Sequence, residues 1–350
     1  MVEWLAGNRI IGTTAERPNF GLPSGSVGGW VELGRHVIGT ASSEVFVASL
    51  PDKRYYMVLY EDKGEASAQA RLLRYNSDAN NIYSNRVSTN GASDTEQNTQ
   101  PQHNGWNGNN TTPQFNVWHI ANLAGKEKLL ISEGVMQSNP PARVEYAGKS
   151  TLSAVINRIG VIQNASTHST GTTMTVLGWD PTDTHTTNFW EELASVEYSG
   201  GTALTSGTIY ARKYLWVQAY LKIASGTVDS NLWGFNAENT GTNYSARYSR
   251  DGVFPDGTNT GISHMNINFG AGTRNNQLIN MFIINNSANE KLVTGSGISQ
   301  AASGSGTAPN RLEFVSKWSN TSDQITSIQC TQGNSLNFES GTIMKVWGSD

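Results

Sequence analysis

The sequence has few charged residues, a single cysteine and no long apolar run. Only 15% of its 350 residues are charged and the formal net charge is −4, so the chain lacks the clustered Lys and Arg of a nucleic-acid-binding domain. The one cysteine, Cys330, excludes an internal disulfide framework, and its alternating surroundings, ITSIQCTQ, predict a buried strand residue. No segment approaches the roughly 20 apolar residues of a membrane-spanning helix. We therefore expect neither direct nucleic-acid binding nor a membrane span.

Sequence signatures of catalysis and cofactor binding are missing as well. There is no Gly-rich phosphate loop, no Ser nucleophile elbow and no Cys paired with a recognisable His motif. The six histidines are scattered without metal-ligand spacing. Asp180, Asp183 and His185 come closest to a cluster; this segment is typical of a turn between domains, and a bound cation stays open as the alternative. We predict a protein that is not an enzyme, with no catalytic residues, no cofactor and no metal.

What the chain does contain is short strand-like segments between polar turns. Gly, Ser, Thr and Asn are abundant, and they separate β-branched and aromatic runs such as EVFVASL, RYYMVLY and TMTVLGW. The most helix-like segment is NFWEELASVE, but the similar segment GWVELGRHVI contains Gly34 and β-branched residues, so we interpret both as strands. About eight strands in each half of the chain indicate an all-β protein.

These two segments belong to a repeat that extends through the chain. Asn76 matches Asn236 and Tyr83 matches Tyr244, while the motif EKL occurs at 127–129 and again at 290–292. The segment GTTMTVLGWD from residue 171 matches GTIMKVWGSD from residue 341. The matches keep one order in both halves and their offset grows slowly, as expected for a duplicated domain with loop insertions. Each repeat is far longer than the 20 to 50 residues of a solenoid unit.

Eight short strands in roughly 150 residues without alternating helices predict a two-sheet sandwich of the jelly-roll type. We therefore expect two tandem homologous jelly-roll (β-sandwich) domains with an N-terminal arm. The predicted boundaries are an arm at 1–29, domain 1 at 30–180, a linker at 181–189 and domain 2 at 190–350. The polar segments 90–113 and 299–310 are predicted to be an exposed excursion and a flexible loop.

Aromatic residues admit two interpretations. Most lie in strand-like segments, which predicts core or inter-domain positions; these are Tyr55, Trp118, Tyr214, Trp216 and Trp233. Trp106 instead lies alone in the polar segment 90–113. It is either a contact to another subunit or a platform on which a glycan stacks, and both possibilities stay open.

The repeated motifs resemble a known class of proteins. The segments GWVELG, LPDKRYYMVL, RYNSDANNIYSNRVSTNG and KEKLLISEGV, with the closing TVLGWD or KVWGSD, resemble virion structural proteins of viruses and phages that infect marine prokaryotes. In size and architecture the chain also resembles the double jelly-roll major capsid proteins of tailless double-stranded DNA viruses, whose trimers form pseudo-hexagonal tiles. The barrels of those capsid proteins usually lack the mutual similarity found here, which leaves a tail, spike or decoration role open.

The resemblance implies a non-enzymatic virion protein that self-assembles, as a capsid shell subunit or an external tail or spike subunit. Its expected partners are copies of itself, in a trimer or a larger assembly, and other virion proteins. The opening residues lack the basic start and apolar run of a signal peptide, so synthesis in the host cytoplasm is expected. The alternative is a carbohydrate-binding protein that recognises host-surface glycans.

Overall fold

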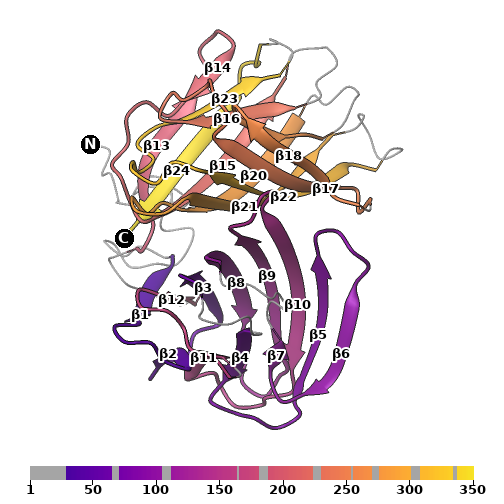
Figure 1. The fold of residues 1–350 in the computed structure, drawn as a ribbon. Coiled ribbons are helices and arrows are strands. Elements are labelled where there is room, and N and C mark those ends of the chain that lie inside the picture. The colour runs from indigo at the N-terminus through magenta and orange to yellow at the C-terminus, as the bar shows by residue number, and fades with distance from the viewer. Residues whose placement is uncertain are drawn as a thin grey trace, which may run out of the picture. The chain divides into compact units, whose positions relative to one another are not determined.

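The structure is a computed structural model, and it describes residues 29–64, 71–104, 112–163, 165–180, 188–223, 230–253, 255–269, 276–300, 308–333 and 337–350. The arm expected at 1–29 and the linker expected at 181–189 thus lie almost entirely outside the described residues. All regular secondary structure in the described residues is β-strand. No helix long and apolar enough to cross a membrane occurs in this part of the chain. The predicted all-β fold of two tandem jelly-roll sandwiches is confirmed (Figure 1).

The first repeat consists of an eight-stranded and a four-stranded antiparallel sheet in its described residues. The large sheet has the order β1 (Val31–Val37), β12 (Thr173–Trp179), β3 (Tyr55–Asp62), β8 (Gln114–Ala121), β9 (Lys128–Met136), β10 (Ala142–Ser150), β5 (Tyr83–Thr89) and β6 (Thr95–Gln100). The small sheet has the order β2 (Glu44–Ala48), β11 (Arg158–Gln163), β4 (Arg71–Tyr75) and β7 (His103–Asn104).

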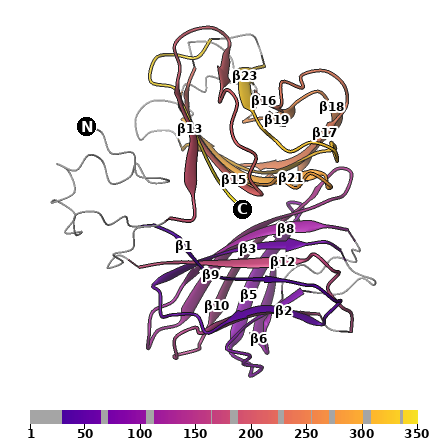
Figure 2. The same cartoon turned by 90° about the vertical axis from the view of Figure 1, so that its left-hand side faces the viewer.

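The second repeat has the same two sheets in the same order. Figure 2 shows both repeats after a turn of 90° from the view of Figure 1. Its large sheet is formed by β13 (Glu191–Glu197), β24 (Ile343–Ser349), β15 (Tyr214–Lys222), β20 (Asn276–Ile284), β21 (Lys291–Ser299), β22 (Asn310–Trp318), β17 (Tyr244–Arg250) and β18 (Gly257–Ile262). Its small sheet is formed by β14 (Ala203–Thr205), β23 (Ile328–Gln332), β16 (Asn231–Phe235) and β19 (Met265–Ile267). Each strand of the first repeat therefore has one counterpart in the second.

The counterparts also pair in the same register. In the first repeat Trp179 lies opposite Tyr55, and in the second Ser349 lies opposite Tyr214. The turn before each closing strand contains a glycine with positive φ, Gly171 at 88° and Gly341 at 87°, a conformation that glycine adopts at little cost. This agreement of register lets each residue of one repeat be compared with a single residue of the other.

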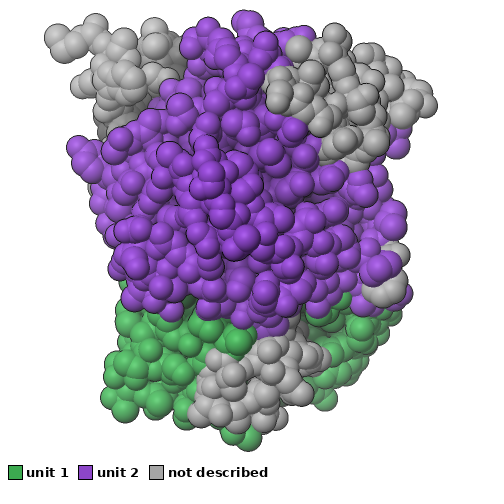
Figure 3. All heavy atoms as spheres, turned by 45° about the horizontal axis from the view of Figure 1, so that its top comes forward, with its two compact units in different colours: residues 1–89, 94–134, 144–191 green, residues 90–93, 135–143, 192–350 purple. Residues whose placement is uncertain are grey.

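Side chains from both sheets form one core in each sandwich. Alternating residues of the large sheet, such as Val58 and Val176, meet Val45 and Ile159 of the small sheet, because successive strand residues point to opposite faces. The second repeat has the same arrangement. Figure 3 colours the compact units into which the chain divides, residues 1–89, 94–134 and 144–191 in unit 1 and residues 90–93, 135–143 and 192–350 in unit 2.

An asparagine at the end of the small sheet holds a neighbouring loop in each repeat. Asn76 has φ 53° and Asn236 has φ 54°. The Oδ1 atom of Asn76 accepts hydrogen bonds from the backbone N–H groups of Asn157 (2.8 Å) and Arg158 (3.1 Å). Asn236 Oδ1 accepts the equivalent bonds from residues 326 (2.7 Å) and 327 (3.1 Å). The repeated asparagine found in the sequence is therefore a structural residue of the sandwich rim.

The structure contains strands that the sequence pattern did not predict. Instead of about eight, twelve strands lie in the described residues of each repeat. The segment 90–113, predicted to be an exposed excursion, contains β6 and β7. The β6 segment TEQNTQ is polar and mostly exposed, so it has no apolar alternation from which a strand could be predicted. Conversely, the segment GTIYA at 207–211, which contains β-branched and aromatic residues, has no regular structure.

Candidate functional site

An open cleft lies on the outward face of the large sheet in the first repeat. It has a volume of about 380 Å³ and is lined by Trp30, Tyr55, Tyr56, His119, Ile120, Ala121, Leu129, Leu130, Ile131 and Trp179. Three aromatic rings form one side: Tyr55 and Trp179 stack with centroids 5.3 Å apart, and Trp30 is tilted against Trp179 at 6.4 Å. The volume falls within the range of ligand-binding pockets, roughly 300 to 1,000 Å³.

The strand register explains why these rings meet. Tyr56 belongs to the core, so its neighbour Tyr55 points to the opposite face of the sheet. Trp179 is the cross-strand partner of Tyr55 on β12, and directly opposed side chains on one face are close enough to interact. The second repeat has Ser349 in place of Trp179, so the same pair cannot form there.

Two aliphatic side chains extend the cleft along β9. Leu129 and Ile131 are 56% and 63% exposed, whereas Lys128 and Leu130 between and beside them are buried. No Asp, Glu, Lys or Arg occurs among the described residues that line the cleft. We call the group Trp30, Tyr55, Trp179, Leu129 and Ile131 the apolar face. Its chemistry suits association with another apolar or aromatic surface.

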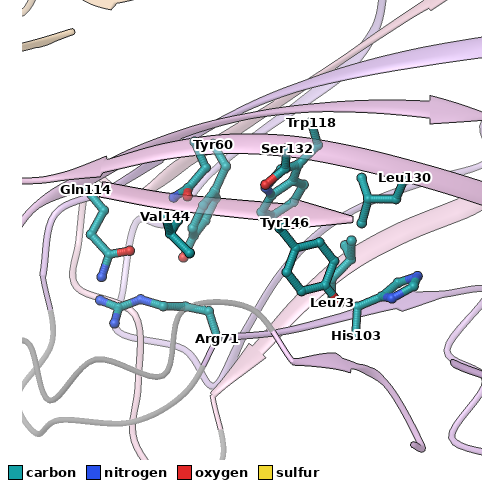
Figure 4. A pocket seen from close by; sticks show the side chains of 11 residues that line it. Tyr60, Arg71, Leu73, His103, Gln114, Trp118, Leu130, Ser132, Val144 and Tyr146 are labelled. Atoms are coloured by element: carbon teal, nitrogen blue, oxygen red, sulfur yellow. The ribbon is translucent and has the colours of Figure 1, made fainter. Parts of the chain in front are cut away.

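A second, smaller cavity lies between the sheets of the same repeat (Figure 4). Its volume is about 30 Å³, which is room for about one water molecule. It is lined by Tyr60, Arg71, Leu73, His103, Gln114, Asn116, Trp118, Leu130, Ser132, Val144 and Tyr146. Figure 4 shows Arg71 beside Gln114 and, farther along, His103 near Tyr146. The interior of this sandwich is therefore polar at positions where a core is normally apolar.

The charge of Arg71 is neutralised inside the sandwich. Its guanidinium donates to Asp62 Oδ2 at 2.7 Å, and both side chains are buried. The other carboxylate oxygen accepts from the backbone N–H of Gly64 (3.1 Å) and the hydroxyl of Thr172 (3.3 Å). A buried carboxylate whose two oxygens are both hydrogen-bonded has a structural role and does not serve as an open acid–base group.

Two buried histidines accompany this ion pair. His103 is 1% exposed, and its Nδ1 lies 2.7 Å from Asn85 Oδ1. Burial lowers the pKa of His103 to about 3, so the ring is neutral at pH 7. His168 is fully buried, and its Nε2 donates to the carbonyl of Val161 at 3.1 Å. Burial also lowers the pKa of His168. Neither histidine is accessible to a large substrate.

The residues singled out in the sequence are distributed as follows. Cys330 is fully buried in β23, and burial raises the pKa of its thiol well above the usual value, which confirms the prediction of a buried, unreactive strand residue. Asp180 ends the described segment after β12, while Asp183, His185 and Trp106 lie outside the described residues. Among the described side chains there is no group of three or more His, Cys, Asp or Glu residues placed to hold a metal.

The aromatic residues predicted to lie in the core or between domains divide into two groups. Trp118, Tyr214 and Trp233 are buried, as predicted. Tyr55 and Trp216 are only partly buried and lie on the outward faces of their sheets. Strand alternation would have separated Tyr55 from the core residue Tyr56. No comparable signal existed for His103 or for the Asp62–Arg71 pair, because a single sequence does not show which polar residues are buried.

Comparisons with known proteins leave the family of the chain undefined. No family model matches the sequence, and no curated protein matches it. Among solved structures, domains LG4-5 of the mouse laminin alpha1 chain match with 11% sequence identity and a TM-score of 0.16, over 92% of this chain and 91% of that one.

Proposed function

We propose that this chain is a non-enzymatic virion structural protein that self-assembles, as a capsid shell subunit or an external tail or spike subunit. Its partners would be copies of itself, in a trimer or larger assembly, and other virion proteins. The observation that carries the proposal is the apolar face of the first repeat, where Leu129 and Ile131 are 56% and 63% exposed. The sequence resemblance to virion proteins sets the biological context.

The composition of this face supports association between protein surfaces. Contiguous exposed apolar surface commonly marks an interaction site, and the centres of protein interfaces are depleted in charge and enriched in aromatic residues. The described lining of the cleft has both properties. A second copy that covers Leu129 and Ile131 would gain about 25 cal/mol for each Å² of apolar surface removed from water.

Light scattering after size-exclusion chromatography tests self-assembly directly. We expect the wild-type chain to form trimers or larger species, and Ile131→Asp to shift the population toward monomer by at least tenfold in apparent dissociation constant. Val253 is the matched control, because it is an aliphatic residue with the same 63% exposure outside the apolar face. A wild-type chain that stays monomeric at high concentration contradicts the proposal, as does an equal effect of Val253→Asp.

A second candidate function, recognition of host-surface glycans, is favoured by the three rings of the cleft. Aromatic faces stack on the apolar face of pyranose rings, and Trp179 with Tyr55 and Trp30 provides such a surface in an open cleft. A glycan array separates the candidates. We expect Trp179→Ala to abolish binding if the cleft is the site and Trp106→Ala to abolish it if the polar segment is. A chain that binds no sugar removes this candidate.

A further inference from the structure

The first repeat buries two imidazoles at positions that are apolar in the second repeat. His103 pairs with Leu73 between β7 and β4, and Met265 pairs with Trp233 at the same place between β19 and β16. His168 lies three residues before the turn glycine of its repeat, and Phe338 lies three residues before the equivalent glycine. Both replacements, Met265 and Phe338, are buried. The two repeats thus differ in titratable interior groups while sharing one fold.

Tyrosine rings and an amide pack around His103. Tyr75 of β4 and Tyr83 of β5 place their rings 5.3 and 4.7 Å from the imidazole, and Tyr146 of β10 lies at 5.9 Å. Asn85 of β5 contacts Nδ1, and the charged side chain in the same cavity is the cation Arg71. An imidazolium at this position would be desolvated among tyrosine rings, which disfavours the charged form.

His168 is held as a neutral ring by three hydrogen-bonding groups. The carbonyl of Val161 on β11 accepts from Nε2 at 3.1 Å. The Nδ1 atom lies 3.2 Å from the hydroxyl of Tyr60 on β3 and 3.3 Å from the amide nitrogen of Gln163 on β11. Protonation of Nδ1 would replace an acceptor by a donor and disrupt these contacts. The charged groups near it are Asp62, Arg71 and Glu44, and Asp62 is already paired with Arg71.

The direction of the pH effect follows from linkage. Burial lowers the pKa of His103 from 6.5 to about 3 and that of His119, on β8 of the same repeat, to about 4, and it also lowers the pKa of His168. As the pH falls below 6.5, the unfolded chain takes up protons that the folded chain does not, so stability decreases with falling pH. Each such histidine raises the unfolded fraction by about tenfold per pH unit until its folded-state pKa is reached, and the factors of several such histidines multiply.

We propose that the first repeat is an acid-sensitive half of the molecule, which opens below about pH 6 while the second repeat stays folded. The two buried imidazoles are the device: His103 lines the small cavity, and His168 contacts Tyr60, another residue of its lining. In the described part of the second repeat, the histidine present is His264, which is partly exposed and contacts Ser263. Burial lowers the pKa of His264 as well, but its ring is partly exposed, so water can solvate the charged form.

Hydrogen–deuterium exchange of the full chain at pH 7, 6, 5 and 4.5, corrected for the intrinsic pH dependence of amide exchange, tests the proposal. Peptides from β4, β5 and β7 should lose protection by at least tenfold per pH unit below pH 6, while peptides from β16, β17 and β19 stay protected. His103→Met and His168→Phe insert the residues of the second repeat. Each substitution should make the loss of protection in the first repeat about tenfold smaller per pH unit.

The reciprocal change provides a readout that does not depend on the stability of those variants. Met265→His places an imidazole inside the second repeat and should make that repeat lose protection in acid, by about tenfold per pH unit. Val253→His, at an exposed position, is the control and should leave the exchange unchanged. Equal loss of protection in both wild-type repeats overturns the proposal, as does an unchanged slope in the folded His103→Met or His168→Phe chain, or no effect of Met265→His.

Discussion

The two repeats share one strand order and one set of rim hydrogen bonds, yet they fill their interiors with different chemistry. The first repeat buries Asp62, Arg71, His103 and His168, and the second repeat has an apolar or amide residue at each equivalent position. These counterparts are Leu221, Asn231, Met265 and Phe338. The comparison teaches that this topology is specified by strand pairing and by the rim, since the interior tolerates both an ion pair and a leucine.

The largest effect should come from breaking the buried ion pair. Asp62→Leu alone leaves the Arg71 guanidinium buried without its carboxylate, and we expect a loss of about 3 to 5 kcal/mol in the stability of the first repeat. Adding Arg71→Asn, which completes the pattern of the second repeat, should restore most of this loss. Urea unfolding, followed by hydrogen exchange in peptides of β3 and β4, measures both.

If the double variant loses as much as the two single variants together, the interiors are not interchangeable and the comparison fails. Leu221→Asp with Asn231→Arg is the reverse exchange in the second repeat. It should be more stable than Leu221→Asp alone, because the new arginine would pair with the new carboxylate.

At the rim we expect an intermediate loss of stability that is the same in both repeats. Asn76→Ala and Asn236→Ala each remove three hydrogen bonds from the side chain to backbone groups, two accepted by Oδ1 and one donated by Nδ2, at a residue with φ near 53° or 54°. Each variant should lose about 1 to 3 kcal/mol, with additional strain because alanine disfavours positive φ. Asn76→Gly and Asn236→Gly keep the backbone conformation and separate the two causes. Markedly unequal losses in the two repeats would show that the rim is not shared energetically.

The smallest effect concerns an ion pair that the repeats share but bury differently. Glu127–Lys149 spans 3.3 Å with side chains 48% and 52% exposed, and Glu290–Lys317 spans 3.1 Å with side chains 15% and 13% exposed. Double-mutant cycles with Gln and Met should give about 0 to 0.5 kcal/mol for the first pair and up to about 1 kcal/mol for the second. The interaction energy of the exposed Glu127–Lys149 pair should fall to zero in 1 M salt, because salt screens exposed charges. A stronger exposed pair would contradict the role assigned to burial.

The sequence predicted the fold because fold and repeat depend on the same residues. Alternating apolar runs identified the central strands, and Gly34 correctly argued against a helix at β1, which the structure shows as a strand. Edge strands such as β6 were missed because they have few buried neighbours and therefore little apolar pattern. The apolar face was missed because Tyr55 and Trp179 become neighbours only through the register of two strands far apart in the chain.

The polar interior of the first repeat could not have been predicted either. Asp62 and Arg71 are nine residues apart in sequence, and their approach depends on where β3 ends and β4 begins. His103 precedes a segment outside the described residues, and only its pairing with Leu73 places it between the sheets. Asp, Arg and His are usually exposed, so a single sequence gives no reason to expect that these residues are buried.

The asparagine rim has a consequence for how such a protein can change. Because Asn76 and Asn236 hold their loops through backbone groups, the attachment is indifferent to which side chains the neighbouring strands carry. Inner residues can then be exchanged in sets, an ion pair for an aliphatic contact or an imidazole for a thioether, without the chain having to find a new path. In a protein with two such sandwiches, the interior residues of one sandwich can stay unchanged while those of the other are replaced by residues with different chemistry.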